Sequence, residues 1–126
     1  MEYLIWGIKI GIFISIINVW FFRFKKTTPF RGGKANSMPQ EFEAYGLPES
    51  FLYVIGPLKV GSALALFISI WMPEFTVYPA AIMAVLMLGA IFMHLKIKDP
   101  LNKAIPAAIF LILSLILIWD ASSSFA

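Results

Sequence analysis

Residues 51–95 read FLYVIGPLKVGSALALFISIWMPEFTVYPAAIMAVLMLGAIFMHL and contain two long apolar runs, 51–71 and 77–95, separated by five residues. Each run has the roughly 20 residues that a helix needs to cross about 30 Å of hydrocarbon. The apolar residues are continuous and do not alternate with a period of two, which excludes a membrane β-barrel. The stretch therefore predicts two consecutive membrane-spanning helices joined by a short connection.

Two further apolar runs, 3–22 and 104–119, flank this central pair. The chain has 126 residues, of which 60% are hydrophobic and 13% charged, whereas a soluble domain has about 25% charged residues. We therefore predict an all-α, polytopic membrane protein, in which four transmembrane helices over about 3–22, 51–71, 77–95 and 104–119 form a bundle in a single domain. The absence of cysteine excludes a disulfide relay, a thiolate zinc site, an iron–sulfur cluster and a cysteine nucleophile within this chain.

The connection 23–50 is long, and its second half has the pattern of a short helix over about 38–45. Ser37 and Gln40 have the spacing of a capping box, and Gly46 is a typical helix end. Apolar residues at helical spacing between them predict an interfacial helix on the membrane or against the bundle.

The basic residues outside the spans are distributed unevenly. Eight Lys and Arg lie in the connections 23–50 and 96–103, and none lies outside the spans on the opposite side. The positive-inside rule then places these two connections in the cytoplasm and both termini outside a bacterial-type cytoplasmic (inner) membrane. We interpret the net charge of +3 as a signal of orientation, not of nucleic-acid binding. Trp20 and Tyr53 are expected in the aromatic belt at the inner boundary.

Local patterns also predict where two helices begin. Asp99-Pro100 reads as an N-cap followed by proline at the first helical position, and Thr76 is a candidate cap for the third span. The fourth span is expected to end before Asp120, which marks the return to water.

Two lysines interrupt the spans, at an insertion cost of about 2.5–3.5 kcal/mol for such a charge near the bilayer centre. Lys9 lies close enough to the outer boundary for its stem to reach the head groups, so we expect it to snorkel. Lys59 is closer to the midplane, so we expect it to face the bundle interior or a wet cavity. Its candidate partners are Asn18, Tyr53, a carbonyl freed by Pro57, Glu41 and Glu43.

His94, the sole histidine, cannot alone complete a two-ligand haem site, and the spans offer no carboxylates for a metal site, so we predict no metal. Its position suits an interfacial hydrogen bonder or proton acceptor. The sequence thus predicts an inner cavity between Lys59, His94 and the segment 37–46, with room for a quinone or a lipid. The candidate ligand-binding residues are Lys59, His94, Asn18, Tyr53, Arg31 and Glu41, and a purely structural role for them is the alternative.

The order of short motifs resembles the DoxX-like family of small four-helix membrane proteins. The resemblance runs through Gly46-Leu47-Pro48, Ile55-Gly56, Leu58-Lys59-Val60, Gly89-Ala90, His94, Lys98-Asp99-Pro100-Leu101 and Lys103-Ala104-Ile105-Pro106. It implies a membrane subunit, because the family's namesake is linked to a sulfur-compound:quinone oxidoreductase, other bacterial members accompany redox-defence partners, and animal relatives assist receptor-channel assembly.

The sequence carries no intrinsic cofactor motif and no nucleophile–base pair. We therefore expect a non-catalytic subunit or assembly partner of a membrane redox complex, with no catalytic residues of its own. The alternative is a small transporter or exporter of a hydrophobic compound, although a proton-coupled exporter needs a carboxylate within its spans. Stripes of small residues, such as Gly7, Gly11 and Ser15, leave a homodimer open besides a membrane protein partner.

Overall fold

The computed structural model describes residues 2–22, 37–47 and 49–125, and all regular structure in these ranges is helical. Four long helices carry the fold, and shorter helices join or extend them. In chain order the elements are α1 (Glu2–Ile17), η1 (Asn18–Phe22), α2 (Met38–Ala44), α3 (Glu49–Ile68), η2 (Pro73–Phe75), α4 (Val77–Lys96), η3 (Leu101–Ala104) and α5 (Ile105–Phe125).

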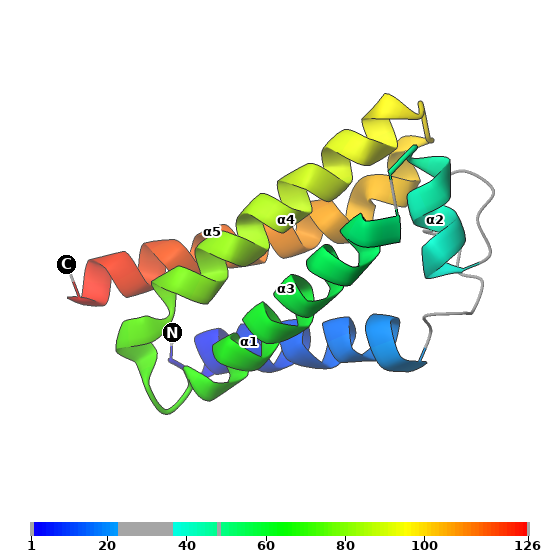
Figure 1. The fold of residues 1–126 in the computed structure, drawn as a ribbon. Coiled ribbons are helices and arrows are strands. Elements are labelled where there is room, and N and C mark those ends of the chain that lie inside the picture. The colour runs from blue at the N-terminus through cyan, green and yellow to red at the C-terminus, as the bar shows by residue number, and fades with distance from the viewer. Residues whose placement is uncertain (1, 23–36, 48, 126) are drawn as a thin grey trace.

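The four long helices form one bundle, with α2 at one end (Figure 1). Helix α4 packs most extensively on α5, α1 packs on α3, and α3 joins the two pairs through α4. The start of α1, the turn between α3 and α4 and the end of α5 lie at one end of the bundle (Figure 1). Helix α2 and the connection between α4 and α5 lie at the other end, which we call the α2 end.

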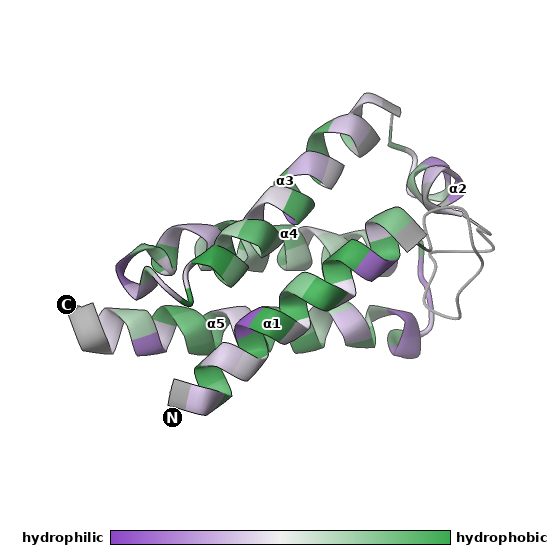
Figure 2. Ribbon diagram, turned by 90° about the horizontal axis from the view of Figure 1, so that it is seen from below, coloured by the Kyte–Doolittle hydropathy of each residue, from purple (hydrophilic) through white to green (hydrophobic). Residues whose placement is uncertain are grey.

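Apolar side chains fill the interior and also cover the outside of the bundle. Helix α1 contributes an isoleucine to the core at nearly every turn, and the other long helices supply small residues, leucine and methionine. Figure 2 shows apolar residues predominating along the long helices. Exposed faces such as Ile105, Ile109, Ile112 and Leu115 of α5 are as apolar as the core. A surface of this kind is suited to lipid, so the chain is a multi-pass membrane protein.

Three stretches are long and apolar enough to cross a membrane: Tyr3–Phe21, Pro73–Lys96 and Leu101–Ser123. The apolar part of α3 is shorter, Tyr53–Ile68, so three of the four predicted spans meet this criterion in the described residues. The last helix is longer than the predicted 104–119. It continues to Phe125, so Asp120 lies within the helix and not beyond its end.

Helix α2 begins and ends as its sequence indicates. The Ser37 hydroxyl accepts a hydrogen bond from the Gln40 N–H at 3.4 Å. Gly46 has a φ of 76°, and the N–H groups of Gly46 and Leu47 bond to the carbonyls of Glu43 and Phe42. This is the Schellman arrangement, which needs a left-handed residue after the helix.

Two predicted caps are wrong. Thr76 has helical backbone angles and makes no side-chain cap bond, because the short helix η2 already leads into α4. Pro100 precedes the 3₁₀-helix η3 in an extended conformation and does not open an α-helix. The carboxylate of Asp99 bonds instead to a side chain of α4, as described below.

The prediction that Lys9 snorkels to the head groups is also wrong. Only 2% of Lys9 is exposed, and its Nζ donates a hydrogen bond to the Ser69 carbonyl at 3.2 Å. Ser69 follows the end of α3, where the helix dipole attracts a cation. Asp120 of α5 adds a favourable electrostatic interaction. Lys9 therefore points into the bundle and joins α1 to the end of α3.

Candidate functional site

A cavity of about 480 Å³ lies in the half of the bundle near α2. Side chains from all four long helices line it, together with η1 and the end of α2. The lining is mostly apolar, and its polar or ionisable residues are Asn18, Tyr45, Lys59, His94 and Lys103, with the indole of Trp20. A cavity of this size, apolar with a few polar groups, is typical of small-molecule sites.

The end of the first long helix forms one wall of the cavity. The chain changes there from α1 to the π-helical turn η1, and Asn18, Val19 and Trp20 of this turn all line the cavity. Wider helical turns of this kind are frequent at functional sites.

Trp20 is held against α3 by a close fit to a glycine. A Cβ atom at Gly56 would lie 2.8 Å from Cζ3 of the Trp20 ring, a distance that real Cβ atoms essentially never show. Trp20 is 9% exposed, so its indole faces the bundle interior. The indole lies in the cavity wall because glycine leaves room for it.

Lys59 lies one helical turn beyond Gly56 on α3 and lines the cavity, as expected for a lysine near the middle of a span. Its Nζ is 5.8 Å from the centroid of a Trp20 ring, within the range of a cation–π interaction. This indole face is a partner that the sequence did not indicate. Lys59 is half-buried, so part of its side chain is accessible from the cavity.

A series of aromatic contacts runs from Trp20 along the wall to His94. Trp20 meets Phe42 edge to face with ring centroids 6.4 Å apart, and Phe42 lies 6.2 Å from Tyr45. Tyr45 in turn meets the His94 ring edge to face at 5.7 Å. Helix α2 thus forms the part of the wall that connects η1 with α4.

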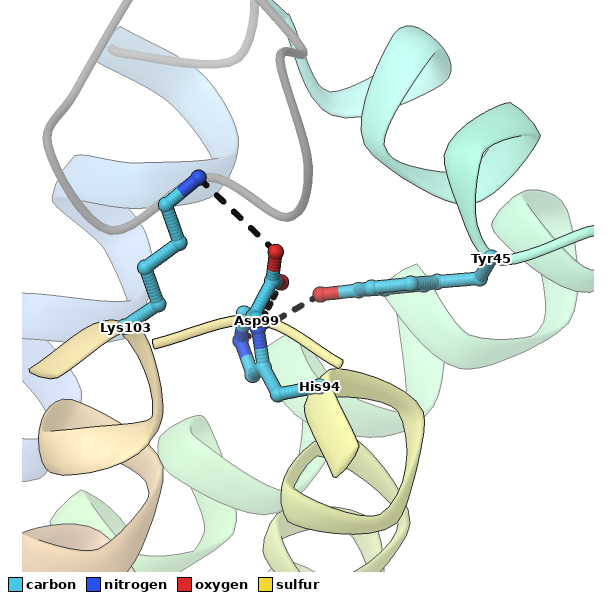
Figure 3. A network of polar contacts seen from close by, with 4 residues as sticks. All are labelled: Tyr45, His94, Asp99 and Lys103. Carbon is cyan, nitrogen blue, oxygen red and sulfur yellow. Dashed lines mark hydrogen bonds and ion pairs between the residues drawn. The ribbon is translucent and has the colours of Figure 1, made fainter. Parts of the chain in front are cut away.

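His94 is 5% exposed and stands at the centre of a polar network (Figure 3). Its Nδ1 is 2.8 Å from Oδ2 of Asp99, and its Nε2 is 3.3 Å from the Tyr45 hydroxyl. Lys103 Nζ lies 3.9 Å from the other Asp99 oxygen. Because a carboxylate only accepts, Nδ1 donates to Asp99, and in the tautomer that carries its proton on Nδ1 the Nε2 atom accepts from the tyrosine O–H.

The backbone after α4 places Asp99 against His94. Lys98 has a φ of 57°, and the Asp99 N–H donates to the His94 carbonyl at 2.9 Å. A left-handed lysine is an uncommon, strained conformation, and it turns the chain so that Asp99 lies over the last turn of α4. Lys96 adds a second link, since its Nζ donates to the Tyr45 carbonyl at 3.1 Å. These contacts hold the end of α2 on α4.

The structure brings three of the six sequence-predicted site residues to one cavity: Lys59, His94 and Asn18. Tyr53 is 67% exposed and does not line it, because it lies on the outer face of α3. Arg31 lies outside the described residues. Glu41 belongs to α2, but the structure does not describe its side chain.

Five residues that the sequence did not assign to the site complete it: Trp20, Tyr45, Gly56, Asp99 and Lys103. The sequence predicts Asp99 as a helix cap, although its distance of five residues from His94 also allows contact across a helix end. Tyr45 is 49 residues from His94, so only the tertiary fold reveals the pair.

No group of three His, Asp or Glu that could hold a metal ion occurs among the described residues. No curated protein and no solved structure matches the chain. A family model described as the DoxX-like family matches residues 16–117, a range that includes every described lining residue of the cavity and the complete Tyr45–His94–Asp99–Lys103 network. The chain therefore belongs to the DoxX-like family.

Proposed function

We propose that this protein is a non-catalytic membrane subunit that binds a quinone or a lipid in the cavity near α2. The observation that carries the proposal is the cavity itself, which combines apolar walls with two ammonium groups, an imidazole and a phenol. Ligand sites in proteins commonly have this composition, in which apolar walls provide affinity and a few polar groups provide orientation. The bound molecule reaches the cavity from the bilayer, since Phe51 and Val85 belong to the lining and are also exposed on the outside of the bundle.

Trp20 allows a direct test by fluorescence. The chain has four tryptophans, and the variant W6F/W71F/W119F retains only Trp20, the one that lines the cavity. Addition of decylubiquinone or a short-chain menaquinone to this variant in nanodiscs is expected to quench Trp20 with saturation.

The matched control retains only Trp119, which is 61% exposed and lies outside the cavity lining. Quinone dissolved in the bilayer should quench Trp119 weakly and without saturation. Equal quenching of the two variants would show that the cavity does not bind quinone, and the same pair with brominated lipids tests the lipid alternative.

Family membership supports a role as a subunit or assembly partner of a redox complex. The polar side chains of the site support it as well, because they can hold and orient a bound molecule. Crosslinking in native membranes followed by affinity purification tests it. Co-purification of an oxidoreductase subunit supports the proposal, whereas recovery of homodimers alone would contradict it.

We also propose an inner-membrane location with both termini outside. The bundle supports it, because the described parts of both basic connections lie at the α2 end. The chain has no cysteine, so K98C and S123C each introduce a single label site at an exposed position. An impermeant maleimide should label S123C in intact cells and K98C only after lysis; the reverse pattern would invert the topology.

A further inference from the structure

The contacts of His94 fix the direction in which hydrogen bonds run at one end of the cavity. A carboxylate has no proton to give, so Oδ2 of Asp99 accepts from Nδ1 of His94, which is 2.8 Å away. In the tautomer that carries its proton on Nδ1, the other ring nitrogen, Nε2, is an acceptor. Asp99 therefore positions His94 so that its Nε2 atom receives a hydrogen bond from another group.

The structure shows which kind of group fits this acceptor, because a phenol already lies there (Figure 3). The Tyr45 hydroxyl is 3.3 Å from Nε2, beyond the range of about 2.7–3.2 Å that is typical of hydrogen bonds between nitrogen and oxygen. Tyr45 and His94 both line the cavity, so a molecule inside it lies beside this long contact. The rings of Phe42 and Tyr45 also give the wall an aromatic surface on which a further ring can pack. A bound phenol can thus make a shorter bond to Nε2 than Tyr45 does.

We infer that the cavity selects a molecule with an aromatic hydroxyl group, as in the reduced form of a quinone, and that this hydroxyl donates to Nε2 of His94 in place of Tyr45. This inference rests on the proposed function, since it specifies the chemical form of the molecule held in the same cavity. The oxidised form of a quinone presents carbonyl oxygens, which only accept, so it cannot bond to an acceptor nitrogen. An alkyl tail on the molecule lies along the apolar lining and extends toward the exposed rim at Phe51 and Val85.

The sole histidine allows a direct test by nitrogen NMR, because ¹⁵N-histidine labels a single imidazole in the chain. The protein is studied in nanodiscs near pH 8, above the range in which free histidine takes up a proton. Before any addition, Nδ1 should give the resonance of a protonated nitrogen and Nε2 that of an acceptor. Addition of para-octylphenol is expected to move the Nε2 resonance with saturation. Para-octylanisole, in which a methyl group replaces the hydroxyl proton, should leave it in place.

Two tyrosine substitutions test the exchange at Nε2. Tyr45→Phe removes the competing hydroxyl and keeps the ring, so octylphenol should bind at least threefold more tightly. Tyr78→Phe makes the same change at a tyrosine that is 70% exposed and outside the lining, so the affinity for octylphenol should not change. If Tyr45→Phe does not fold, the comparison of phenol with anisole in the unmodified protein still decides.

The two forms of a quinone extend the test to the molecules of the proposed function. Decylubiquinol should move the Nε2 resonance as octylphenol does. It is expected to bind at least tenfold more tightly than decylubiquinone, whose binding is measured by quenching in the variant that retains only Trp20.

The outcomes separate the inference from the function on which it rests. The inference is overturned if Nε2 itself carries a proton, if phenol and anisole act alike on its resonance, or if Tyr45→Phe folds and leaves the phenol affinity unchanged. Saturable quenching of Trp20 by decylubiquinone or by brominated lipids would then still support the cavity as a binding site. Absence of any saturable change at His94 and at Trp20 with all of these molecules overturns both.

Discussion

The two ends of the bundle each bury an ionisable side chain, but they do so in different ways. At the end that carries the termini, Lys9 is enclosed and donates to a backbone carbonyl at the end of α3. At the α2 end, His94 is equally buried, yet its partners are side chains from other elements and its ring borders a cavity. Lys9 has its partner within the packed core, whereas His94 belongs to a network that a bound molecule can reach.

The difference teaches how to interpret a charge inside a membrane protein. A lysine that closes a helix end serves the fold, because it gives the C-terminal carbonyls a cation and connects helices. A histidine or lysine that lines a cavity remains accessible to a further partner. Burial alone does not separate the two cases, but the surroundings do.

The largest expected effect comes from reversing the charge of Lys9, at the end of the bundle that carries the termini. Lys9→Glu places a carboxylate against the Ser69 carbonyl and in the field of Asp120. We expect a loss of about 3–5 kcal/mol in the free energy of unfolding, as when a buried pair is broken. Thermal unfolding in detergent measures it, and Lys98→Glu, the same charge change at an exposed site, is the control. Equal melting temperatures for the two variants would contradict a structural role for Lys9.

The second prediction concerns the network at the α2 end. Asp99→Ala removes the carboxylate that holds His94 and pairs with Lys103, and we expect a loss of about 1.5–3 kcal/mol, the range for hydrogen bonds to charged groups. Hydrogen exchange should accelerate in 38–47, because α2 is held on α4 through Tyr45. Asn102→Ala, an exposed position in η3, serves as the control; unchanged exchange in Asp99→Ala would show that α2 is held by other contacts.

The third prediction tests the fit between Trp20 and Gly56. Gly56→Ala brings a methyl group 2.8 Å from the indole, so the ring must move, at a cost of about 1–2 kcal/mol in stability. Trp20 emission should shift in the variant that retains only this tryptophan. Gly61→Ala adds the same methyl group on the same helix, at a position where nothing lies within 4 Å. This control should not shift the Trp20 emission. Identical emission from both variants would refute the close fit.

The smallest expected effect is a gain. Lys98→Gly relieves the left-handed backbone after α4 and should raise the free energy of unfolding by about 0.5–1 kcal/mol. Lys98→Ala removes the same charge but keeps a Cβ, so it should give no gain. Equal stability of the two variants in chemical denaturation would indicate that the backbone at this residue stores no strain.

The sequence predicted the helices better than the directions of their side chains. Run lengths and turn residues indicated the long helices and the short helix that ends at Gly46, because these features are local. The roles of Lys9 and Lys59 were harder to assign. In spans that are apolar on all sides, the pattern of residues does not reveal which face points inward, so a lysine near the boundary was expected to snorkel.

The candidate site was predictable in part, from the few polar residues in the spans. Polar residues are rare in apolar spans, so Lys59, His94 and Asn18 were evident from the sequence, and the structure places all three on one cavity. Their partners were not evident. Trp20 and Tyr45 look like ordinary interfacial aromatics in the sequence, and their contacts with Lys59 and His94 join residues 39 and 49 positions apart.

The contacts of α2 have a consequence for the order in which the bundle is completed. The Tyr45 hydroxyl bonds to His94 and the Tyr45 carbonyl accepts from Lys96, residues 49 and 51 positions further along the chain. Because chains are synthesised from the N-terminus, α2 can reach its final place only after α4 is present. The cavity is therefore completed late in synthesis, when most of the chain already lies in the membrane.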